Sequence, residues 1–248
     1  MSTRAPAVRK AVMSRKPEAA EAAAPAGSAI EIAYERIYAA IIDHSLPPGV
    51  RLIENRLCEI FGLGRTRVRQ VLQKLASERL VTLLPNRGAI VTLPTVQEAL
   101  DIFEARRLLE PAITARFVAK ATRADVQRIK DHLQKEKAAA RRNDRRAAIR
   151  LSGEFHLIIA ECAGNATLLE LLRELVSRSS LIIAVYQEAA SACCPPDEHQ
   201  ELVTALDKRR DDAAQLMLEH LDHVLADLRL QEPETPGVDL LAILGEPA

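Results

Sequence analysis

The feature that most restricts the fold of this 248-residue chain is a single β-hairpin pattern close to its start. Residues 80–84 and 89–93 are runs rich in apolar and β-branched residues, and a turn containing Pro85 and Gly88 lies between them. After residue 95 the apolar residues recur at helical rather than strand spacing. We therefore expect a mainly α protein with one small β element.

Three helical segments precede the hairpin. Residues 30–44 carry one apolar stripe and end before a Pro-Pro-Gly sequence. A short helix is expected over 54–61 and another over 66–78, with Gly62-Leu63-Gly64 as a tight turn between them. Three helices followed by a hairpin predict a winged helix-turn-helix.

The rest of the chain predicts an all-helical bundle. Pro94-Thr95 is a short linker, and Pro111 is expected to bend or split the first helix of the bundle. Helical patterns cover 96–119, 123–142, 145–162, 166–190, 197–208 and 211–230. The expected domains are a disordered tail over 1–28, the winged helix-turn-helix over 29–93, an all-helical effector-binding and dimerisation domain over 96–230, and a loose tail over 231–248.

Charge divides the chain in the same way. Residues 1–95 carry 14 Lys and Arg against 8 Asp and Glu, a net charge of +6. Residues 96–248 carry 20 against 26, a net charge of −6, so the whole chain is neutral. A basic first part indicates a polyanionic partner for that part alone.

The sequence also indicates a cytoplasmic protein. No apolar run approaches the length of a membrane span, and the first 20 residues lack the apolar core of a secretory signal. The four cysteines show no zinc spacing and no disulfide framework, and adjacent Cys193 and Cys194 are expected to be reduced loop thiols.

The start of the helix over 66–78 points to DNA. A recognition helix places its N-terminal residues in the major groove, where arginine can bind guanine and a hydroxyl can bind phosphate. The alternative is an ordinary solvated helix start, but the position after a glycine turn and before a basic hairpin tip favours DNA. The candidate DNA-binding residues are Arg65, Thr66, Arg67, Arg69, Gln70 and Arg87.

This region resembles the N-terminal domain of GntR-family regulators. The matching residues run from Leu46-Pro47-Pro48-Gly49 through Gly62-Leu63-Gly64-Arg65-Thr66-Arg67-Val68-Arg69-Gln70 to Arg87-Gly88. Many relatives have Pro in place of Arg67 and Ser or Thr in place of Gly64. The resemblance implies a DNA operator as partner but not its base sequence.

Residues 96–230 resemble the all-helical FCD effector domain found in FadR-type members of that family. The matching pieces are Arg106 with Glu110-Pro111, Phe155-His156, Gly164-Asn165, His199 and His220-Leu221. Independently of the resemblance, His156, His199 and His220 each lie on the apolar stripe of a different expected helix. Three inward imidazoles are either hydrogen-bonded core residues or a shared polar cavity that suits Zn²⁺ or Ni²⁺.

The metal ligand set departs from the pattern of metal-binding relatives. In those proteins an Asp stands four residues before the first histidine, whereas this chain has Ser152 there. A hydroxyl is a poorer ligand than a carboxylate, so both a divalent metal and a metal-free pocket remain open. Glu154 lies two residues from His156 and is expected to point elsewhere.

Arg106 is the candidate anion-binding residue. It lies on the inner face of its expected helix, and an inward arginine requires an anion. The resemblance implies an effector carboxylate, and the alternative is an internal pair with Glu110. Arg178 is a further candidate donor. The expected effector-binding residues are Arg106, Ser152, His156, Arg178, His199 and His220, and the expected metal ligands are His156, His199 and His220.

These observations predict a ligand-responsive transcription regulator rather than an enzyme. A homodimer is expected to bind a near-palindromic operator, and a small, acidic metabolite is expected to alter its DNA affinity. One alternative is a metal-dependent helical-bundle hydrolase, but no general base is evident beside the histidines. The other is a constitutive DNA-binding protein whose second domain only dimerises.

Overall fold

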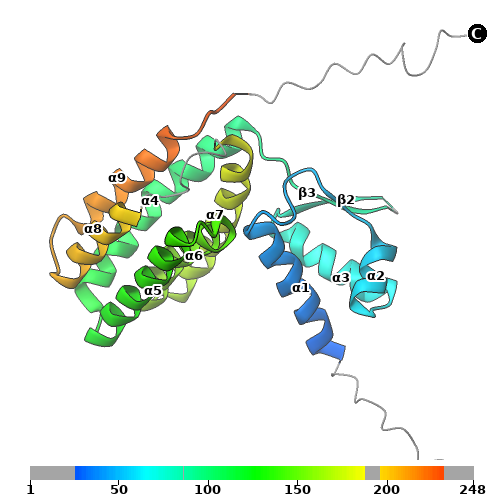
Figure 1. The fold of residues 1–248 in the computed structure, drawn as a ribbon, viewed down its shortest axis with the longest axis horizontal. Helices are drawn as coiled ribbons and strands as arrows, with labels where there is room; N and C mark the ends of the chain where they lie inside the picture. Colours follow the sequence, from blue (N-terminus) through cyan, green and yellow to red (C-terminus); the bar gives the residue numbers. More distant parts are fainter. Residues whose placement is uncertain (1–25, 86, 188–195, 232–248) are drawn as a thin grey trace, which may run out of the picture.

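The computed structural model describes residues 26–85, 87–187 and 196–231. It has two lobes, a winged helix-turn-helix and a helical bundle, which meet where α1 approaches α7 (Figure 1). Most of the predicted tails over 1–28 and 231–248 lies outside the described residues, as do Cys193 and Cys194, but residues 26–28 belong to the first helix. No helix within the described ranges is both long enough and apolar enough to cross a membrane.

The first lobe confirms the predicted winged helix-turn-helix. Its helices are α1 (Ala26–Ile42), α2 (Glu54–Phe61) and α3 (Arg65–Ser77). Its strands are β1 (Arg51–Leu52), β2 (Val81–Leu84) and β3 (Gly88–Val91), in the antiparallel order β1-β3-β2. Two details differ from the sequence prediction: α1 begins at Ala26 rather than residue 30, and the two-residue strand β1 was not foreseen.

Glycines permit two close turns in this lobe. Gly62 ends α2 in the left-handed conformation, with φ of 63°. Gly88 has φ of +92°, and a Cβ atom built there would lie 2.0 Å from the carbonyl oxygen of Leu52. Only glycine therefore allows β3 to lie beside β1, which fixes the wing against the rest of the domain.

The core of the first lobe is completed from the second. Val68, Val71, Leu72 and Leu75 of α3 face inward and pack with α1 and the sheet. Leu181, from α7 of the bundle, belongs to the same cluster of buried side chains and is 2% exposed. The orientation of α3 is thus set by its packing on α1 and on the sheet.

The second lobe has six helices in its described part. They are α4 (Val96–Lys120), α5 (Arg123–Arg141), α6 (Arg145–Cys162), α7 (Ala166–Tyr186), α8 (Pro196–Asp207) and α9 (Ala213–Ala226). Thr95 and Thr122 start α4 and α5 with reciprocal capping boxes, and Asp144 and Asn165 cap α6 and α7. Pro111 does not split the first of these helices, which runs unbroken as α4.

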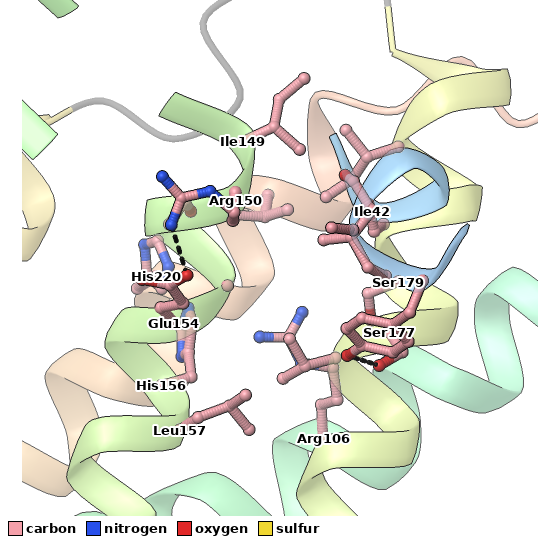
Figure 2. Close-up of a pocket in the computed structure, with 18 of the residues that line it drawn as sticks. Ile42, Arg106, Ile149, Arg150, Glu154, His156, Leu157, Ser177, Ser179 and His220 are labelled. Atoms are coloured by element: carbon pink, nitrogen blue, oxygen red, sulfur yellow. Dashed lines mark hydrogen bonds and ion pairs between the residues drawn. The ribbon is translucent and has the colours of Figure 1, made fainter. Parts of the chain in front are cut away.

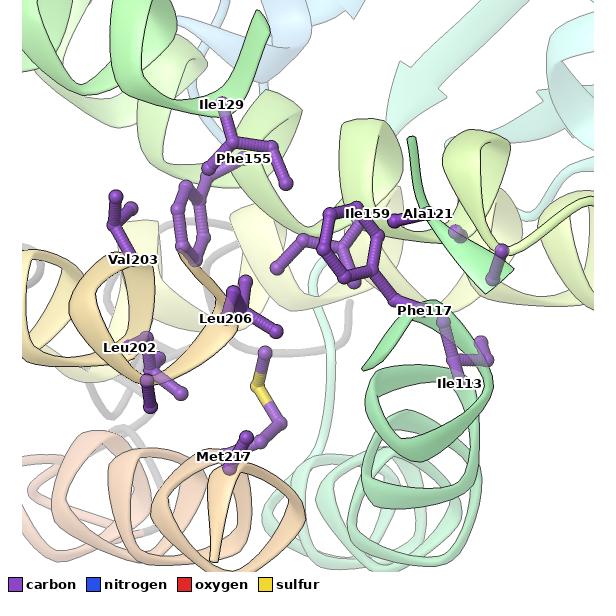
Figure 3. Packing of buried hydrophobic residues seen from close by; sticks show 14 of the residues in the cluster. Ile113, Phe117, Ala121, Ile129, Phe155, Ile159, Leu202, Val203, Leu206 and Met217 are labelled. Carbon is purple, nitrogen blue, oxygen red and sulfur yellow. The ribbon is translucent and has the colours of Figure 1, made fainter. Parts of the chain in front are cut away.

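All six described helices of the bundle, α4 to α9, contribute to its main apolar core (Figure 3). Phe117, Phe155 and Leu206 are almost fully excluded from solvent there. The ends of two helices were predicted too far along the chain: α7 stops at Tyr186 rather than 190, and α9 covers Ala213–Ala226 rather than 211–230. After these ends, Gln187 and Leu228 form an antiparallel bridge.

Candidate functional site

The start of α3 presents a cationic surface. The predicted DNA-binding residues Arg65, Thr66, Arg67, Arg69 and Gln70 are all exposed, as is Arg87 in the turn before β3. Arg65 and Arg67 have no ion-pair partner within the described part of the chain, whereas Arg69 donates from Nε to Glu54 Oε1 of α2 at 2.9 Å. The inward valines and leucines of α3 fix which face carries these side chains.

The three predicted histidines come together in the second lobe. His156 lies on α6, His199 on α8 and His220 on α9, and each is at most 3% exposed. One nitrogen atom from each ring lies within 4.8 Å of the other two. Three helices far apart in sequence therefore converge on one small polar centre.

A carboxylate stands behind each of these imidazoles. The Nδ1 atoms of the rings lie within hydrogen-bond distance of Glu110 (2.5 Å), Glu136 (2.8 Å) and Glu198 (2.6 Å), in the order His156, His199 and His220. A carboxylate can only accept, so Nδ1 carries the proton and Nε2 presents its lone pair to the centre. The same carboxylate–histidine arrangement orients metal-ligating imidazoles in general.

Electrostatics keeps these carboxyl groups ionised. Burial by itself raises the pKa of Glu110, but the charge of Arg106 and the hydrogen bonds from Arg106 and His156 outweigh it and lower the pKa to about 2. Burial likewise opposes ionisation of Glu136, whose hydrogen bonds from His132 and His199 lower the pKa to about 2. Burial lowers the pKa of His156 to about 4 despite Glu110, so its ring is neutral near pH 7.

The arrangement fits a divalent cation. The Nε2 atoms of His199 and His220 face one another at 3.3 Å, although both Nδ1 protons are committed to carboxylates. Two lone pairs at that separation repel unless a proton or a metal ion lies between them. Neutral imidazoles with acceptors behind them are the usual ligands of Zn²⁺ and Ni²⁺.

Ser152 faces the same region as the histidines and offers a hydroxyl there. It is 8% exposed and lines a cavity together with His156 and His220. Glu154 also borders the cavity, where it forms an ion pair with Arg150 at 2.6 Å rather than contacting the histidines. A metal held by three imidazoles would thus keep coordination positions open for an incoming ligand.

Arg106 forms the internal pair with Glu110 that the sequence offered as one interpretation. Its Nε atom donates to Glu110 Oε1 at 2.6 Å, and the side chain is 5% exposed. Its terminal nitrogens point into the cavity, between the histidine side and the helix α7 side (Figure 2). Glu110 therefore links the guanidinium to His156 and places both groups at the same end of the cavity.

The cavity itself has a volume of about 230 Å³. Arg106 gives the cavity one cationic end, beside His156 and His220, and Leu157, Ile149 and Val224 provide apolar walls. Helix α7 supplies Ser177 and Ser179 on the side opposite His156 and His220 (Figure 2), and Ser180 of the same helix also lines the cavity.

The structure separates Arg178 from the other predicted effector residues. Arg178 does not line this cavity, and its guanidinium lies 3.8 Å from Glu98 and 3.6 Å from Glu174. His199 also lies off the cavity wall, behind His220. Sequence reasoning did not foresee Glu136 and Glu198 as partners of the histidines, because their helical spacing alone does not reveal which helices meet.

Comparison with known proteins was consistent over both lobes. Residues 29–91 match the model of the bacterial regulatory proteins of the gntR family, and residues 101–223 match the FCD domain. The chain is 28% identical to the Uxu operon regulator of Haemophilus influenzae, covering 75% of this chain and 76% of that protein. It is 27% identical to the galactonate operon transcriptional repressor of Escherichia coli, covering 71% and 85%.

A solved structure agrees with the fold. A GntR transcriptional regulator from Rhodococcus sp. RHA1 superposes with a TM-score of 0.73 at 26% identity, covering 80% of this chain and 96% of that chain. The agreement extends over the winged helix-turn-helix and the helical bundle together, because the covered share exceeds the length of either lobe.

Proposed function

The chain belongs to the GntR family of bacterial regulatory proteins and carries an FCD domain, and we propose that it is a homodimeric regulator controlled by a small organic anion. Family membership makes it a DNA-binding transcription regulator and not an enzyme. The finer parts of the proposal concern the operator, the metal and the effector. They rest on residues 29–93 as the DNA-binding domain and 96–230 as the sensing and dimerisation domain.

In the proposed complex, two winged helices of a dimer occupy neighbouring half-sites of a near-palindromic operator. The exposed arginines at the start of α3 would enter the major groove, and Arg87 would reach the adjacent backbone. Twofold symmetry of the protein would then be mirrored in the DNA.

The observation that carries the sensing proposal is the meeting of three buried imidazoles beside a buried arginine. His156, His199 and His220 would hold a divalent metal, Zn²⁺ or Ni²⁺, which supplies open coordination positions for anionic oxygens when bound. Arg106 would bind the same carboxylate from the side. The relative that regulates a galactonate operon supports an acidic effector, since galactonate is a carboxylate.

Elemental analysis of the purified protein, with thermal melts before and after chelation, tests this proposal. About one metal per chain and a lower melting temperature after chelation are expected, because a metal bound only by the folded state stabilises it. His199→Gln should abolish both effects. His223→Gln is the control, because His223 is exposed and hydrogen-bonds Glu198, the carboxylate partner of His220, without joining the three rings.

The outcome also decides between the proposal and its alternative. Absence of metal, together with melting temperatures that no organic anion raises, would contradict a sensing domain. A constitutive DNA-binding protein with a purely dimerising bundle would then be the better account, and Ser152 in place of a carboxylate is the observation that favours it.

A further inference from the structure

Helix α1 of the DNA-binding domain forms one wall of the effector cavity. Glu35, Tyr38, Ala39 and Ile42 of α1 line the same space as Arg106, His156 and His220 of the bundle. In Figure 2, Ile42 lies across the cavity from the histidine-bearing side. The cavity is therefore enclosed by both domains rather than by the bundle alone.

The contacts that hold α1 against the bundle are made by residues of the cavity wall. Tyr38 Oη and Ser177 Oγ share a hydrogen bond of 2.6 Å. Ser180 Oγ donates to the carbonyl oxygen of Ile42 at 2.8 Å, and Nε2 of His44 lies 2.8 Å from the carbonyl oxygen of Ser180. Because Ser177 and Ser180 also line the cavity, a molecule bound there touches the groups that set the position of α1.

The position of α1 is in turn tied to the recognition helix. The two helices pack together in the core of the first lobe. Tyr34 of α1 also donates a hydrogen bond of 2.8 Å to Glu78, the residue that follows the end of α3. A displacement of α1 at the cavity wall is thus passed to α3 through a packed and hydrogen-bonded contact.

The volume and the charged residues of the cavity limit the kind of ligand that can bind there. Since a cavity of about 150 Å³ holds benzene, a 230 Å³ cavity holds roughly nine non-hydrogen atoms. Its cations are Arg106 of α4 and Arg150 of α6, which is paired with Glu154, and the charged residue that α1 contributes is Glu35. This distribution suits one anionic group at the Arg106 end and an uncharged tail at the α1 end.

We infer that the effector is a compact monocarboxylate whose uncharged tail is bound by Tyr38, Ala39 and Ile42, so that the DNA-binding domain itself takes part in selecting the effector. The inference rests on the proposed function, because it places the carboxylate at Arg106 and the histidines. It adds that contact with α1 determines which tail lengths bind. A tail of the correct length holds α1 in place against Ser177 and Ser180.

Calorimetric titration of the full-length protein, with and without Zn²⁺, tests the inference with acetate, butyrate, hexanoate and octanoate. Hexanoate should bind more tightly than acetate, and adipate, which adds a second carboxylate to the same chain length, should bind more weakly than hexanoate. Ala39→Leu fills the tail end and should weaken hexanoate by on the order of tenfold while leaving acetate unchanged. Ile42→Ala enlarges that end and should shift the preference towards octanoate.

Ile32→Ala is the matched control, since Ile32 lies on the same helix, is 52% exposed and is absent from the cavity wall. It should bind every probe as the unaltered protein does. If length-dependent binding occurs but Ala39→Leu and Ile42→Ala leave it unchanged, α1 does not read the tail, and the inference fails while the proposed function stands. If none of the monocarboxylates binds the unaltered protein, the inference fails, while the proposed function is decided separately by the metal analysis and the melts with other organic anions.

Discussion

At the scale of single residues, the bundle contains two Arg–Glu pairs with the same helical spacing and opposite surroundings. Arg106 and Glu110 are 5% and 2% exposed, whereas Arg150 and Glu154 are 43% and 40% exposed. Both pairs have a contact of 2.6 Å. The two ion pairs therefore have matched geometry. Their contributions to stability differ because solvent screens the outer pair and hardly reaches the inner one.

Glu110→Gln should lower the free energy of unfolding by about 3 kcal/mol, because it leaves the buried Arg106 charge without its anion. Glu154→Gln should cost less than about 0.5 kcal/mol. Urea unfolding of the two variants measures the difference. Glu110→Gln should also weaken Zn²⁺ binding by about 10- to 100-fold, because it replaces the anionic acceptor behind His156 with a neutral amide. Equal effects of both variants on stability would contradict the role given to burial.

The arginines of the recognition helix give a second prediction at this scale. Alanine in place of Arg65, Arg67 or Arg69 should weaken binding to an operator selected from random DNA, while the melting temperature stays unchanged. A variant that loses a phosphate contact should also reduce the slope of log affinity against log salt by about 1. Lys135→Ala, an exposed cation on the bundle, is the control. Unchanged operator affinity in all three variants would rule out α3 as the recognition helix.

At the scale of elements, the contact between α1 and α7 contains a titratable group, His44. Burial lowers the pKa of His44, Arg145 lowers it further, and the hydrogen bond to the Ser180 carbonyl only partly offsets this. The folded state therefore holds the ring neutral at a pH where the unfolded chain, with a pKa of about 6.5, begins to bind a proton. Its contribution to stability is complete above pH 6.5 and declines as the pH falls towards the lowered value.

His44→Asn tests this pH dependence. Asn accepts the positive φ of 61° found at this position and cannot titrate. The variant should be less stable than the unaltered protein at pH 8, and the difference should shrink at pH 5.5, because only the unaltered protein incurs the protonation penalty. Urea unfolding at the two pH values provides the comparison. A difference that is constant or grows on acidification would contradict the lowered pKa.

Elements were predictable from sequence where periodicity and end signals agreed. The predicted bounds of α2, residues 54–61, agree with the structure, and those of α5 and α6 agree within one residue. Thr122 and Asp144 cap α5 and α6 and so mark where these two helices start. Strand β1 was missed because two residues carry no alternation, and its pairing depends on the distant Gly88. The inward histidines were foreseen from their stripes, but their carboxylate partners depend on which helices pack together, and no local pattern encodes that.

At the scale of the whole molecule, metal binding and DNA binding should be coupled in both directions. If metal changes the affinity for the selected operator by a factor between about 5 and 150, the operator must change the affinity for metal by the same factor. Fluorescence anisotropy with metal-loaded and stripped protein measures the first quantity, and competition with a chelating dye in the presence of operator measures the second. His199→Gln should show neither effect. Unequal factors would mean that metal binds more than one site.

The sharing of Leu181 between the lobes also limits how such a chain can be rearranged. Grafting the winged helix-turn-helix onto a related bundle would carry α1 away from the α7 surface that completes its core and from the serines that bind it. A working chimera would have to bring the matching face of α7 with it. The unit of exchange between such regulators is therefore a DNA-binding domain together with the helix surface it rests on, not the domain alone.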